Sequence, residues 1–413
     1  MVCRGVARDY PCRRPAGQPG LRTSRPPLGA DRSGGAGHFA AGHLRADAGF
    51  RNPVPRHHHR RCGTGPTIRR PGQSPLYQWR TRPRCASGPC GGGQGCKTVT
   101  GEFELIARHF KRPARSAEVR IGIGDDAAAL TPAPGATLLV TTDTLVVGRH
   151  FRPDVPADAL GWKAAMVNLS DLAAMGGTPR WLTLALTLPE ADDAWVAAFA
   201  DGFRAAAEQV EAELVGGDIT RGPLTIGVTA LGETLDAPLT RGAAQAGDQL
   251  WLTGTTGQAA AAVAGLAAGV TPDASLLTRL DRPQARCAAG RAARGLAHAA
   301  IDVSDGVLAD LDHLLKASRL GARLDADALR PTAAMQALAD SLGEAPAPWI
   351  WTGGDDYELL VAVPPERAQT LASIWAEQGL APLCIGELVD APGLQWQGDA
   401  PTIDPVSSGF RHF

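Results

Sequence analysis

Six short acidic clusters, each flanked by glycine, serine or threonine, are the residues of this chain best suited to chemistry. They are Gly122–Ala128 (GIGDDAA), Thr141–Thr144 (TTDT), Asn168–Asp171 (NLSD), Gly216–Asp218 (GGD), Asp302–Gly306 (DVSDG) and Gly353–Glu358 (GGDDYE). Adjacent aspartates such as Asp125 and Asp126 repel each other, so a bend that holds them side by side needs a compensating cation. Carboxylate and hydroxyl oxygens are the ligands that Mg²⁺ prefers. The clusters therefore predict a composite site for divalent cations and, through them, for phosphate.

The usual lysine-based devices for binding phosphate are absent from the sequence. It contains no G-x-x-x-x-G-K-[ST] motif and no kinase-type glycine-rich loop followed by a strand lysine. Lys163 is the only lysine close to the acidic clusters. Metal ions and arginine must then neutralise a bound nucleotide, and Arg241, which precedes a glycine, is the best arginine candidate. A surface salt bridge is the alternative role for Arg241.

Further polar residues could orient a substrate. His150 closely follows the cluster around Asp143, and Asp355, Asp356 and Glu358 offer carboxylates to a cationic or hydroxylated substrate. The alternatives are a structural histidine and a solvated turn. Zinc is not indicated, because the chain shows no sulfur or paired-histidine ligand set.

Strands and helices must position these clusters, and the hydrophobic periodicity predicts where they lie. Thr137–Thr142 is expected to be a buried strand with Thr141, Thr142 and Asp143 at its end, and Leu160–Ala174 a helix with Asp171 late in it. The other elements that should deliver a cluster are strands, at Val119–Ile123, Leu214–Val215 and Ala299–Val303. Alternation of strands and helices in both halves predicts an α/β (α+β) fold of two domains. They are an N-terminal β-rich domain that binds ATP and magnesium, residues 98–238, and a C-terminal α/β domain, residues 239–413.

The first 97 residues differ in composition from the rest of the chain. Of the 413 residues, this segment holds 17 arginines and Lys97 against three aspartates, a formal charge of +15, whereas the remainder carries −16. An Arg-, Pro- and Gly-rich segment without a hydrophobic period cannot offset its chain entropy by burial. We expect a disordered extension outside the working protein; a basic arm for nucleic acid is the alternative.

Cysteine usage and hydropathy indicate the compartment. Only Cys287 and Cys384 follow residue 97, which is no disulfide framework and fits a reducing compartment. The longest apolar run, Ala259–Val270, is short and rich in alanine and glycine, so no membrane span is expected. A cytoplasmic protein is therefore predicted.

The clusters and their flanking residues resemble one known family. The motifs GEFELIARHF, GIGDDAA, TTDTLVVGRHF, NLSDLAAMGG, GGDITRGPL, LTR before GAAQAGD, AIDVSDG and GGDDYEL occur in the order found in the thiamine-monophosphate kinases. The resemblance covers Gly101 to the C-terminus. It implies transfer of the γ-phosphoryl group of ATP to thiamine monophosphate, giving thiamine diphosphate and ADP. It also implies a homodimer of the aminoimidazole-ribonucleotide-synthetase-like fold, with a β-barrel across the interface, that acts on no membrane and no nucleic acid.

The resemblance also implies roles for individual residues. The magnesium ligands would be Asp126, Thr141, Thr142, Asp143, Asp171, Asp218, Asp302 and Asp305. ATP would contact Gly217, Asp218, Arg241 and Ser304. Thiamine monophosphate would contact His150 and Asp355, where the family often has glutamate. Ser407 stands where the family often has an aromatic residue over the substrate, with Phe410 nearby. Whether Asp125 or Asp126 is the ligand stays open, with Asp126 favoured.

The mechanism follows from the charges of the two reactants. An acceptor phosphate is already ionised, so no general base is required, and positioning and electrostatic stabilisation would supply the catalysis, with several Mg²⁺ ions between the two anions. The alternatives are another ATP-using synthetase of the same superfamily, or a non-catalytic nucleotide- or cation-binding protein. Selenophosphate synthetase would require a reactive cysteine or selenocysteine in a glycine-rich loop before GIGDDAA, and no convincing one is present.

Overall fold

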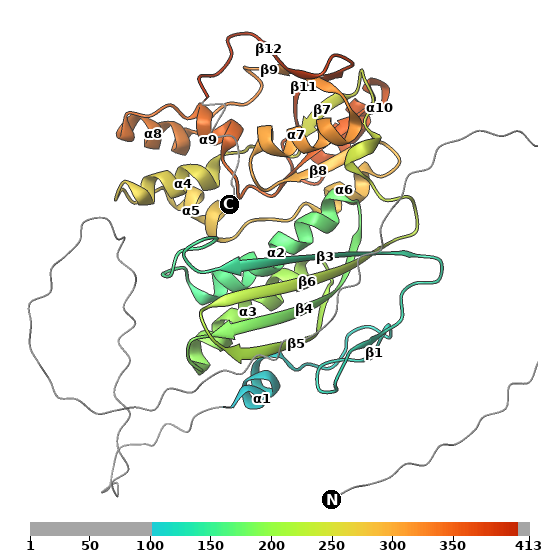
Figure 1. Cartoon of the computed structure of the whole chain (residues 1–413), viewed down its shortest axis with the longest axis vertical. Coiled ribbons are helices and arrows are strands. Elements are labelled where there is room, and N and C mark those ends of the chain that lie inside the picture. Colours follow the sequence, from blue (N-terminus) through green and yellow to red (C-terminus); the bar gives the residue numbers. More distant parts are fainter. Residues whose placement is uncertain (1–100, 404–413) are drawn as a thin grey trace, which may run out of the picture. The chain divides into compact units, whose positions relative to one another are not determined.

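Two β-sheets organise residues 101–403, the part of the chain that the computed structural model describes (Figure 1). The first half contains β1 (Val119–Ile121), β2 (Ala129–Leu130), β3 (Thr137–Val146), β4 (Thr178–Leu188), β5 (Glu213–Arg221) and β6 (Thr225–Thr234). The second half contains β7 (Gln249–Leu252), β8 (Ala299–Val303), β9 (Gly321–Asp325), β10 (Glu358–Val363), β11 (Leu383–Val389) and β12 (Gly393–Gln397). The predicted extension, residues 1–97, and Ser407 and Phe410 lie outside the described residues.

Helices flank both sheets. Those of the first half are α1 (Glu102–Leu105), which continues into the π-helix η1 (Ile106–Phe110), α2 (Ala157–Ala174) and α3 (Asp193–Gln209). The second half contains the 3₁₀ turn η2 (Arg241–Ala243), α4 (Gln258–Ala267), α5 (Ala274–Asp281), α6 (Cys287–Ala293), α7 (Val307–Ser318), α8 (Ala333–Leu342), α9 (Ala347–Thr352) and α10 (Pro365–Glu377). No helix in residues 101–403 is long and apolar enough to cross a membrane.

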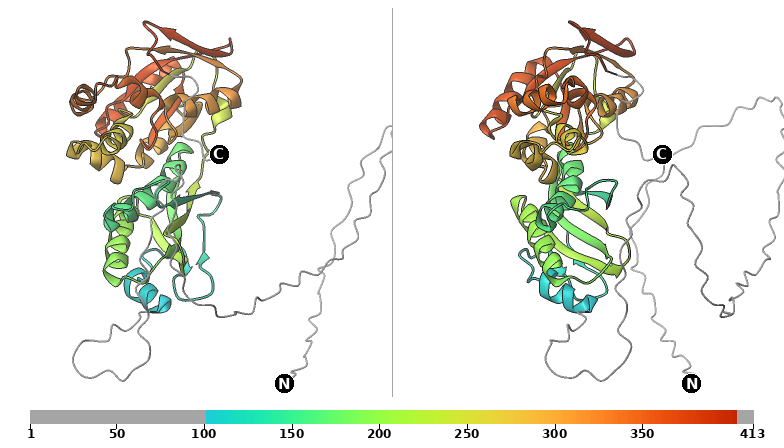
Figure 2. Two further views of the ribbon diagram at one scale, coloured as in Figure 1. Left: turned by 60° about the vertical axis from the view of Figure 1, so that its left-hand side comes forward. Right: turned by 90° about the vertical axis from the view of Figure 1, so that its left-hand side faces the viewer.

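The first sheet has the strand order β3-β6-β4-β5, with β4 and β5 parallel and the other pairs antiparallel. Helices α2 and α3 cover one of its faces (Figure 2). Because side chains alternate along a strand, Leu139 and Leu145 of β3 are buried against these helices, while Leu138 and Val140 are 42% and 59% exposed on the other face. The β1–β2 hairpin covers part of this outer face, where it packs against Trp181.

The second sheet has the strand order β12-β9-β11-β7-β10-β8 and is antiparallel except for the pair β12–β9. Its strand β10 is buried throughout because both faces of the strand are covered. Leu359 and Val361 point into the core that contains α2 and α6, whereas Leu360 and Ala362 point into the core that contains α4 and α7. This arrangement joins α2 to the second sheet. It agrees with the predicted fold class of two α/β domains, while the boundary at 238/239 stays a prediction.

The prediction that Thr141, Thr142 and Asp143 end a strand was wrong. Strand β3 continues to Val146 because its whole length pairs with β6. The side-chain alternation therefore separates the three residues: Thr141 and Asp143 face α2, and the Oγ1 of Thr142 lies 2.8 Å from that of Thr229 on the outer face.

The cluster Gly216–Asp218 was expected after a strand and instead lies within β5. Gly217 has φ of 147°, and a Cβ atom there would lie 1.9 Å from the carbonyl oxygen of Leu184 on β4. Only glycine permits the parallel strands to pair here. Asp218 is exposed on the outer face of the sheet, since its neighbour Ile219 packs into the helix-covered core.

Candidate active site

A cavity of about 1110 Å³ gathers residues from four of the six acidic clusters. Its carboxylates come from β3, from α2 and from the loops that follow β8 and precede β10. The acidic lining residues are Asp143, Asp171, Asp281, Asp302, Asp305 and Asp355, and the basic ones are Arg149, His150, Arg152 and Lys163. Apolar side chains of α4 complete the wall, among them Val263 and Leu266. Folding therefore brings together residues that lie more than 200 positions apart in the chain.

A second cavity of about 410 Å³ adjoins the first at two aspartates. Asp171 and Asp302 line both cavities. Thr141 and Arg241 line the smaller one, together with apolar residues of β3 and α2. The structure thus places Arg241 beside the acidic cluster, while its contact with ATP stays a prediction.

Burial and mutual repulsion perturb the carboxylates where the cavities meet. Burial raises the pKa of Asp143 to about 6, and the charges of Asp171 and Asp305 contribute to the rise. For Asp302, burial and then the charge of Asp171 raise the pKa to about 8. The pKa of Asp171 is also raised by burial, although the Thr141 hydroxyl and the Arg241 guanidinium oppose that rise. The raised pKa values show that these carboxyl groups cannot all carry their charge at neutral pH without a further cation.

Helix α2 and strand β3 orient these carboxylates through hydrogen bonds. The Thr141 hydroxyl donates to Oδ2 of Asp171 at 2.5 Å, and the Ser170 hydroxyl donates to Oδ2 of Asp302 at 2.8 Å. Asn168 accepts a 2.9 Å hydrogen bond from the backbone N–H of Asp143. The NLSD cluster therefore acts through three of its four residues. The sequence predicted only Asp171.

The loop after β8 is fixed by Asp310, a residue that the sequence analysis missed. Its Oδ2 accepts hydrogen bonds of 3.0 Å from the backbone N–H groups of Ser304 and Asp305. Burial raises the pKa of Asp310 to about 7. The signal was present, because an acidic residue in the first turn of a helix often accepts from the preceding loop.

The GGDDYE cluster divides into residues with different environments. Asp355 lines the large cavity, whereas Asp356 and Glu358 are buried away from it. Asp356 accepts a 2.7 Å hydrogen bond from the Gly257 N–H. The expectation that Asp356 and Glu358 orient a substrate was wrong, since both carboxylates are occupied by protein groups.

Glu358 holds the most extensive of these buried contacts. Its Oε1 accepts hydrogen bonds of 2.5 Å from both Arg279 and Arg286, and its Oε2 accepts one of 2.6 Å from the Thr253 hydroxyl. The residue therefore ties β10 to β7 and to the segment around α5 and α6.

His150 lines the large cavity, as its predicted role requires. Its Nδ1 accepts a 3.0 Å hydrogen bond from the backbone N–H of Val146, which fixes the imidazole against the end of β3. Because Nδ1 is the acceptor, the neutral ring carries its proton on Nε2.

Four predicted site residues do not line either of these two cavities. Asp126 is exposed in the bend between β1 and β2, where the Asp125 carboxylate accepts its backbone N–H at 2.9 Å. Thr142, Gly217 and Asp218 lie at the outer face or edge strand of the first sheet. The described residues of one chain thus assemble only part of the predicted site.

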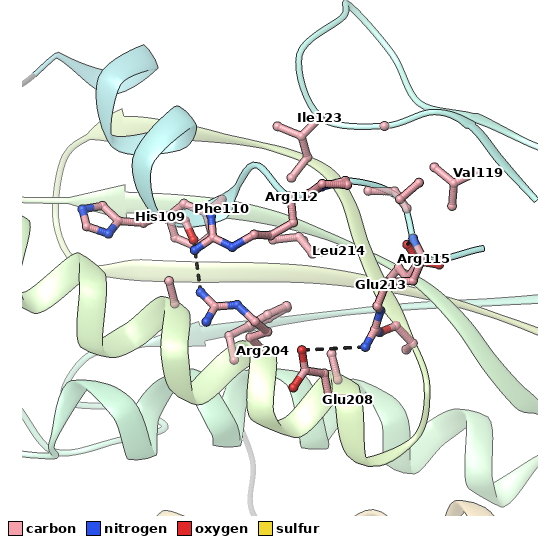
Figure 3. Close-up of a pocket in the computed structure, with 18 residues that line it drawn as sticks. His109, Phe110, Arg112, Arg115, Val119, Ile123, Arg204, Glu208, Glu213 and Leu214 are labelled. Carbon is pink, nitrogen blue, oxygen red and sulfur yellow. Dashed lines mark hydrogen bonds and ion pairs between the residues drawn. The ribbon is translucent and has the colours of Figure 1, made fainter. Parts of the chain in front are cut away.

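A smaller cavity of about 180 Å³ lies at the far side of α3, between that helix, β5 and residues 109–123 (Figure 3). Two of its basic side chains already contact protein acceptors. Arg204 donates a 3.3 Å hydrogen bond to the His109 carbonyl oxygen, and Nη1 of Arg115 lies 3.7 Å from Oε1 of Glu208. Of the acidic clusters, only Gly122 and Ile123 reach it. This cavity lacks the chemistry of a phosphoryl-transfer site.

The oxygen donors of the large cavity suit a Mg²⁺ ion that is held partly by waters and substrate phosphates. They do not form a site in which protein side chains alone surround the ion. In residues 101–403, no three His, Cys, Asp or Glu side chains are grouped closely enough to hold an ion by themselves. Mg²⁺ is commonly held by one or two carboxylates together with waters and substrate phosphates. Asp143, Asp171 and Asp302 supply such carboxylates, and the charge of Asp171 contributes to the raised pKa of both Asp143 and Asp302.

Comparison with known proteins identifies the class of this fold and site. The family model described as AIR synthase related protein, N-terminal domain, matches residues 124–234, and the model for the C-terminal domain matches residues 245–398. The chain is accordingly a two-domain protein related to AIR synthase.

Individual relatives narrow the assignment. The thiamine-monophosphate kinase of Salmonella typhimurium (strain LT2) is 43% identical over 321 residues, which is 76% of this chain and 98% of the relative. That of Escherichia coli (strain K12) is 42% identical over 327 residues, with the same coverage. The chain belongs to the thiamine-monophosphate kinase family, and it is a kinase.

Solved structures agree with this assignment. The crystal structure of thiamine-monophosphate kinase from Stenotrophomonas maltophilia K279a is 42% identical, with a TM-score of 0.65 over 70% of this chain and 93% of that chain. A structure described as AaThiL complexed with AMPPCP and TMP is 30% identical, with a TM-score of 0.61 over 68% of this chain and 89% of that chain.

Proposed function

We propose that this protein transfers the γ-phosphoryl group of ATP to thiamine monophosphate, forming thiamine diphosphate and ADP. The observation that carries the proposal is the junction of two cavities at Asp171 and Asp302. A phosphoryl group must pass between a nucleotide and an acceptor, and two compartments that share a carboxylate wall suit that transfer. The relatives described above bear the name of this activity, and one was solved with an ATP analogue and TMP.

The two compartments take different reactants in this proposal. Arg241 lines the smaller cavity, so we assign the nucleotide phosphates to that side. Ser304 lines the large cavity and would contact these phosphates from the loop after β8. His150 and Asp355 line the large cavity, which we assign to thiamine monophosphate. Ser407 stays a prediction for this side.

The reaction itself needs positioning and charge stabilisation. An oxygen of the acceptor phosphate forms a bond to the γ-phosphorus while the bond from that phosphorus to the β,γ-bridging oxygen breaks in line, and ADP leaves. The acceptor oxygen is already ionised, so no side chain has to remove a proton. Mg²⁺ bound with the phosphates would neutralise the repulsion between the two anions. The proposed ligands in the cavities are Thr141, Asp143, Asp171, Asp302 and Asp305.

The remaining proposed ligands require a second copy of the chain. Asp143 faces α2, whereas Asp218 is exposed on the opposite face of the same sheet. One subunit cannot bring both side chains to one point through its own sheet. The outer face also exposes Leu138 and Val140, which is unusual for neighbouring strand residues of a monomer. We therefore propose a homodimer through this face, in which Asp126, Thr142, Gly217 and Asp218 complete a site of the partner.

The direct test is an assay of the purified full chain with ATP, Mg²⁺ and thiamine monophosphate. Equimolar formation of ADP and thiamine diphosphate is expected, with no transfer to thiamine. A chain lacking residues 1–97 should show the same turnover if this segment lies outside the working protein. Hydrolysis of ATP without phosphorylation of thiamine monophosphate would contradict the proposal and favour another enzyme of the superfamily. A cytoplasmic location is part of the same proposal.

A further inference from the structure

Among residues 101–403, Lys163 is the only lysine whose side chain is buried, at 2% exposure. Removing an ammonium group from water costs several kcal/mol unless acceptors replace the lost hydration. Two acceptors do so here: Nζ donates to Oδ2 of Asp355 at 2.8 Å and to the carbonyl oxygen of Leu280 at 3.1 Å. The lysine lies on α2 in the first half of the chain, and both acceptors belong to the second half.

The Asp355 carboxylate is held at both of its oxygens. Lys163 occupies Oδ2, and the Tyr357 hydroxyl donates to Oδ1 at 2.8 Å. An exposed carboxylate rotates freely about its side-chain bonds, whereas two contacts from different elements leave one orientation. This orientation is maintained at the wall of the large cavity, which all three residues line.

The backbone of the loop that carries Asp355 is strained and is tied to the acidic cluster. Asp355 and Tyr357 have φ of 69° and 53°, in the left-handed region that non-glycine residues rarely adopt. The Asp355 N–H donates to the Ser304 carbonyl oxygen at 2.8 Å, and a Cβ atom on Gly354 would lie 2.3 Å from that oxygen. Such strain is kept only where the surrounding contacts determine it, and the bond to Lys163 is one of these.

We propose that Lys163 is a positioning residue, which orients the Asp355 carboxylate toward the acceptor from the opposite half of the molecule. The inference rests on the proposed function, in which Asp355 contacts thiamine monophosphate. A carboxylate suits this acceptor because thiamine carries a thiazolium cation and an exocyclic amine. Without its ammonium partner, the Asp355 carboxylate would keep only the hydrogen bond from Tyr357 and lose its defined direction.

The first test compares Lys163→Met with Lys316→Met, a control at a lysine whose side chain is 73% exposed. For Lys163→Met, KM for thiamine monophosphate should rise about tenfold or more, because hydrogen bonds to charged groups contribute about 1.5–3 kcal/mol. KM for ATP should stay within about twofold of the parent value. Lys163→Arg, which retains a cation, should recover part of the loss. Lys316→Met should change neither KM.

A purely structural role gives a different result. It would lower the melting temperature of Lys163→Met and leave KM for thiamine monophosphate unchanged, or would raise both KM values together. Either outcome overturns the proposal.

The second test is a double-mutant cycle with Asp355→Asn. If Lys163 acts through Asp355, the double variant should have the same KM for thiamine monophosphate as Asp355→Asn alone. If instead the double variant raises KM for thiamine monophosphate by the product of the two single effects, the proposal is overturned. The double variant removes both partners of the ion pair, so this comparison remains available even if Lys163→Met does not fold.

The proposed function and the positioning role of Lys163 can be contradicted separately. A parent enzyme that forms no thiamine diphosphate contradicts the proposed function. A parent enzyme of normal activity, together with an unchanged KM in Lys163→Met, contradicts only the positioning role.

Discussion

The hydroxyl of Ser170 donates a 2.8 Å hydrogen bond to Oδ2 of Asp302, and both side chains are buried. Ser170 belongs to α2, which covers the first sheet, and Asp302 belongs to β8 of the second. Asp302 borders both cavities. A contact between the two halves of the molecule therefore sets the direction of the carboxylate at the point where the proposed reactants meet.

Ser170→Ala should lower kcat/KM about tenfold, because Asp302 would lose the hydrogen bond that orients its carboxyl group and such a bond contributes about 1 kcal/mol. Steady-state kinetics at saturating Mg²⁺ measure the effect. Ser341→Ala is a matched control, since the Ser341 hydroxyl donates only to the Leu338 carbonyl oxygen at the end of α8. Equal kinetics for the two variants would contradict the role given to Ser170.

Glu358→Gln should destabilise the protein by about 3–5 kcal/mol at pH 7, because it leaves Arg279 and Arg286 without their buried anion. Burial alone would raise the pKa of Glu358, but the two guanidinium groups and the Thr253 hydroxyl outweigh it and hold the pKa below its usual value of 4.5. A lowered pKa in the folded state means that the stabilisation is present above pH 4.5 and is lost as the pH falls further. Urea unfolding should therefore show a smaller loss of stability on acidification in the variant than in the parent. If the free energies of unfolding of the parent and the variant differed by the same amount at every pH, the lowered pKa of Glu358 would be contradicted.

Val140→Asp should convert the proposed dimer to a monomer, because it places a charge on the apolar outer face of the first sheet. Light scattering after gel filtration should give twice the chain mass for the parent and the mass of one chain for the variant. Leu394→Asp, at a 40% exposed residue on the edge strand β12, should leave the dimer intact. A parent protein that is monomeric at assay concentration would contradict the proposal that residues of one subunit complete the site of its partner.

Mixed dimers test whether Asp218 serves the partner's site. Dimers of Asp143→Asn alone or of Asp218→Asn alone should be inactive. A heterodimer of one Asp143→Asn subunit and one Asp218→Asn subunit can be isolated through two different tags. It should regain about half of the parent activity, because one of its two sites receives both unchanged aspartates. A heterodimer as inactive as the two homodimers would place Asp218 and Asp143 in the same subunit's site, and an active Asp218→Asn homodimer would exclude Asp218 from catalysis.

The periodic elements were predicted well because their patterns are local. The strand Ala299–Val303 has the bounds expected from its apolar residues, and the helix expected at Leu160–Ala174 begins only three residues earlier, at Ala157. The acidic clusters were also recognised as candidate site residues, since adjacent carboxylates beside glycine are unusual in any local context. Strand β3 was predicted too short because Asp143 is a poor strand former, and only pairing with β6 extends the strand past it.

The assignments that failed depend on distant contacts. Asp356 and Glu358 are indistinguishable from Asp355 in sequence, yet their partners, Gly257 and Arg286, lie about 70 to 100 residues away. Lys163 was noted as the nearest lysine, but its bond to Asp355 spans 192 positions. Such pairings follow from the packing of α2 against the second sheet, which hydrophobic periodicity does not specify.

The most direct test of the central claim is the rate of thiamine diphosphate formation by Asp143→Asn at saturating ATP, thiamine monophosphate and Mg²⁺. Asp143 lies where the cavity carboxylates converge, so we expect a loss of at least about 10²–10³-fold, with the melting temperature close to that of the parent. Asp312→Asn, at an exposed aspartate of α7 outside the cavities, should retain full activity. Near-normal turnover by Asp143→Asn would contradict the assignment of this cavity as the site of phosphoryl transfer.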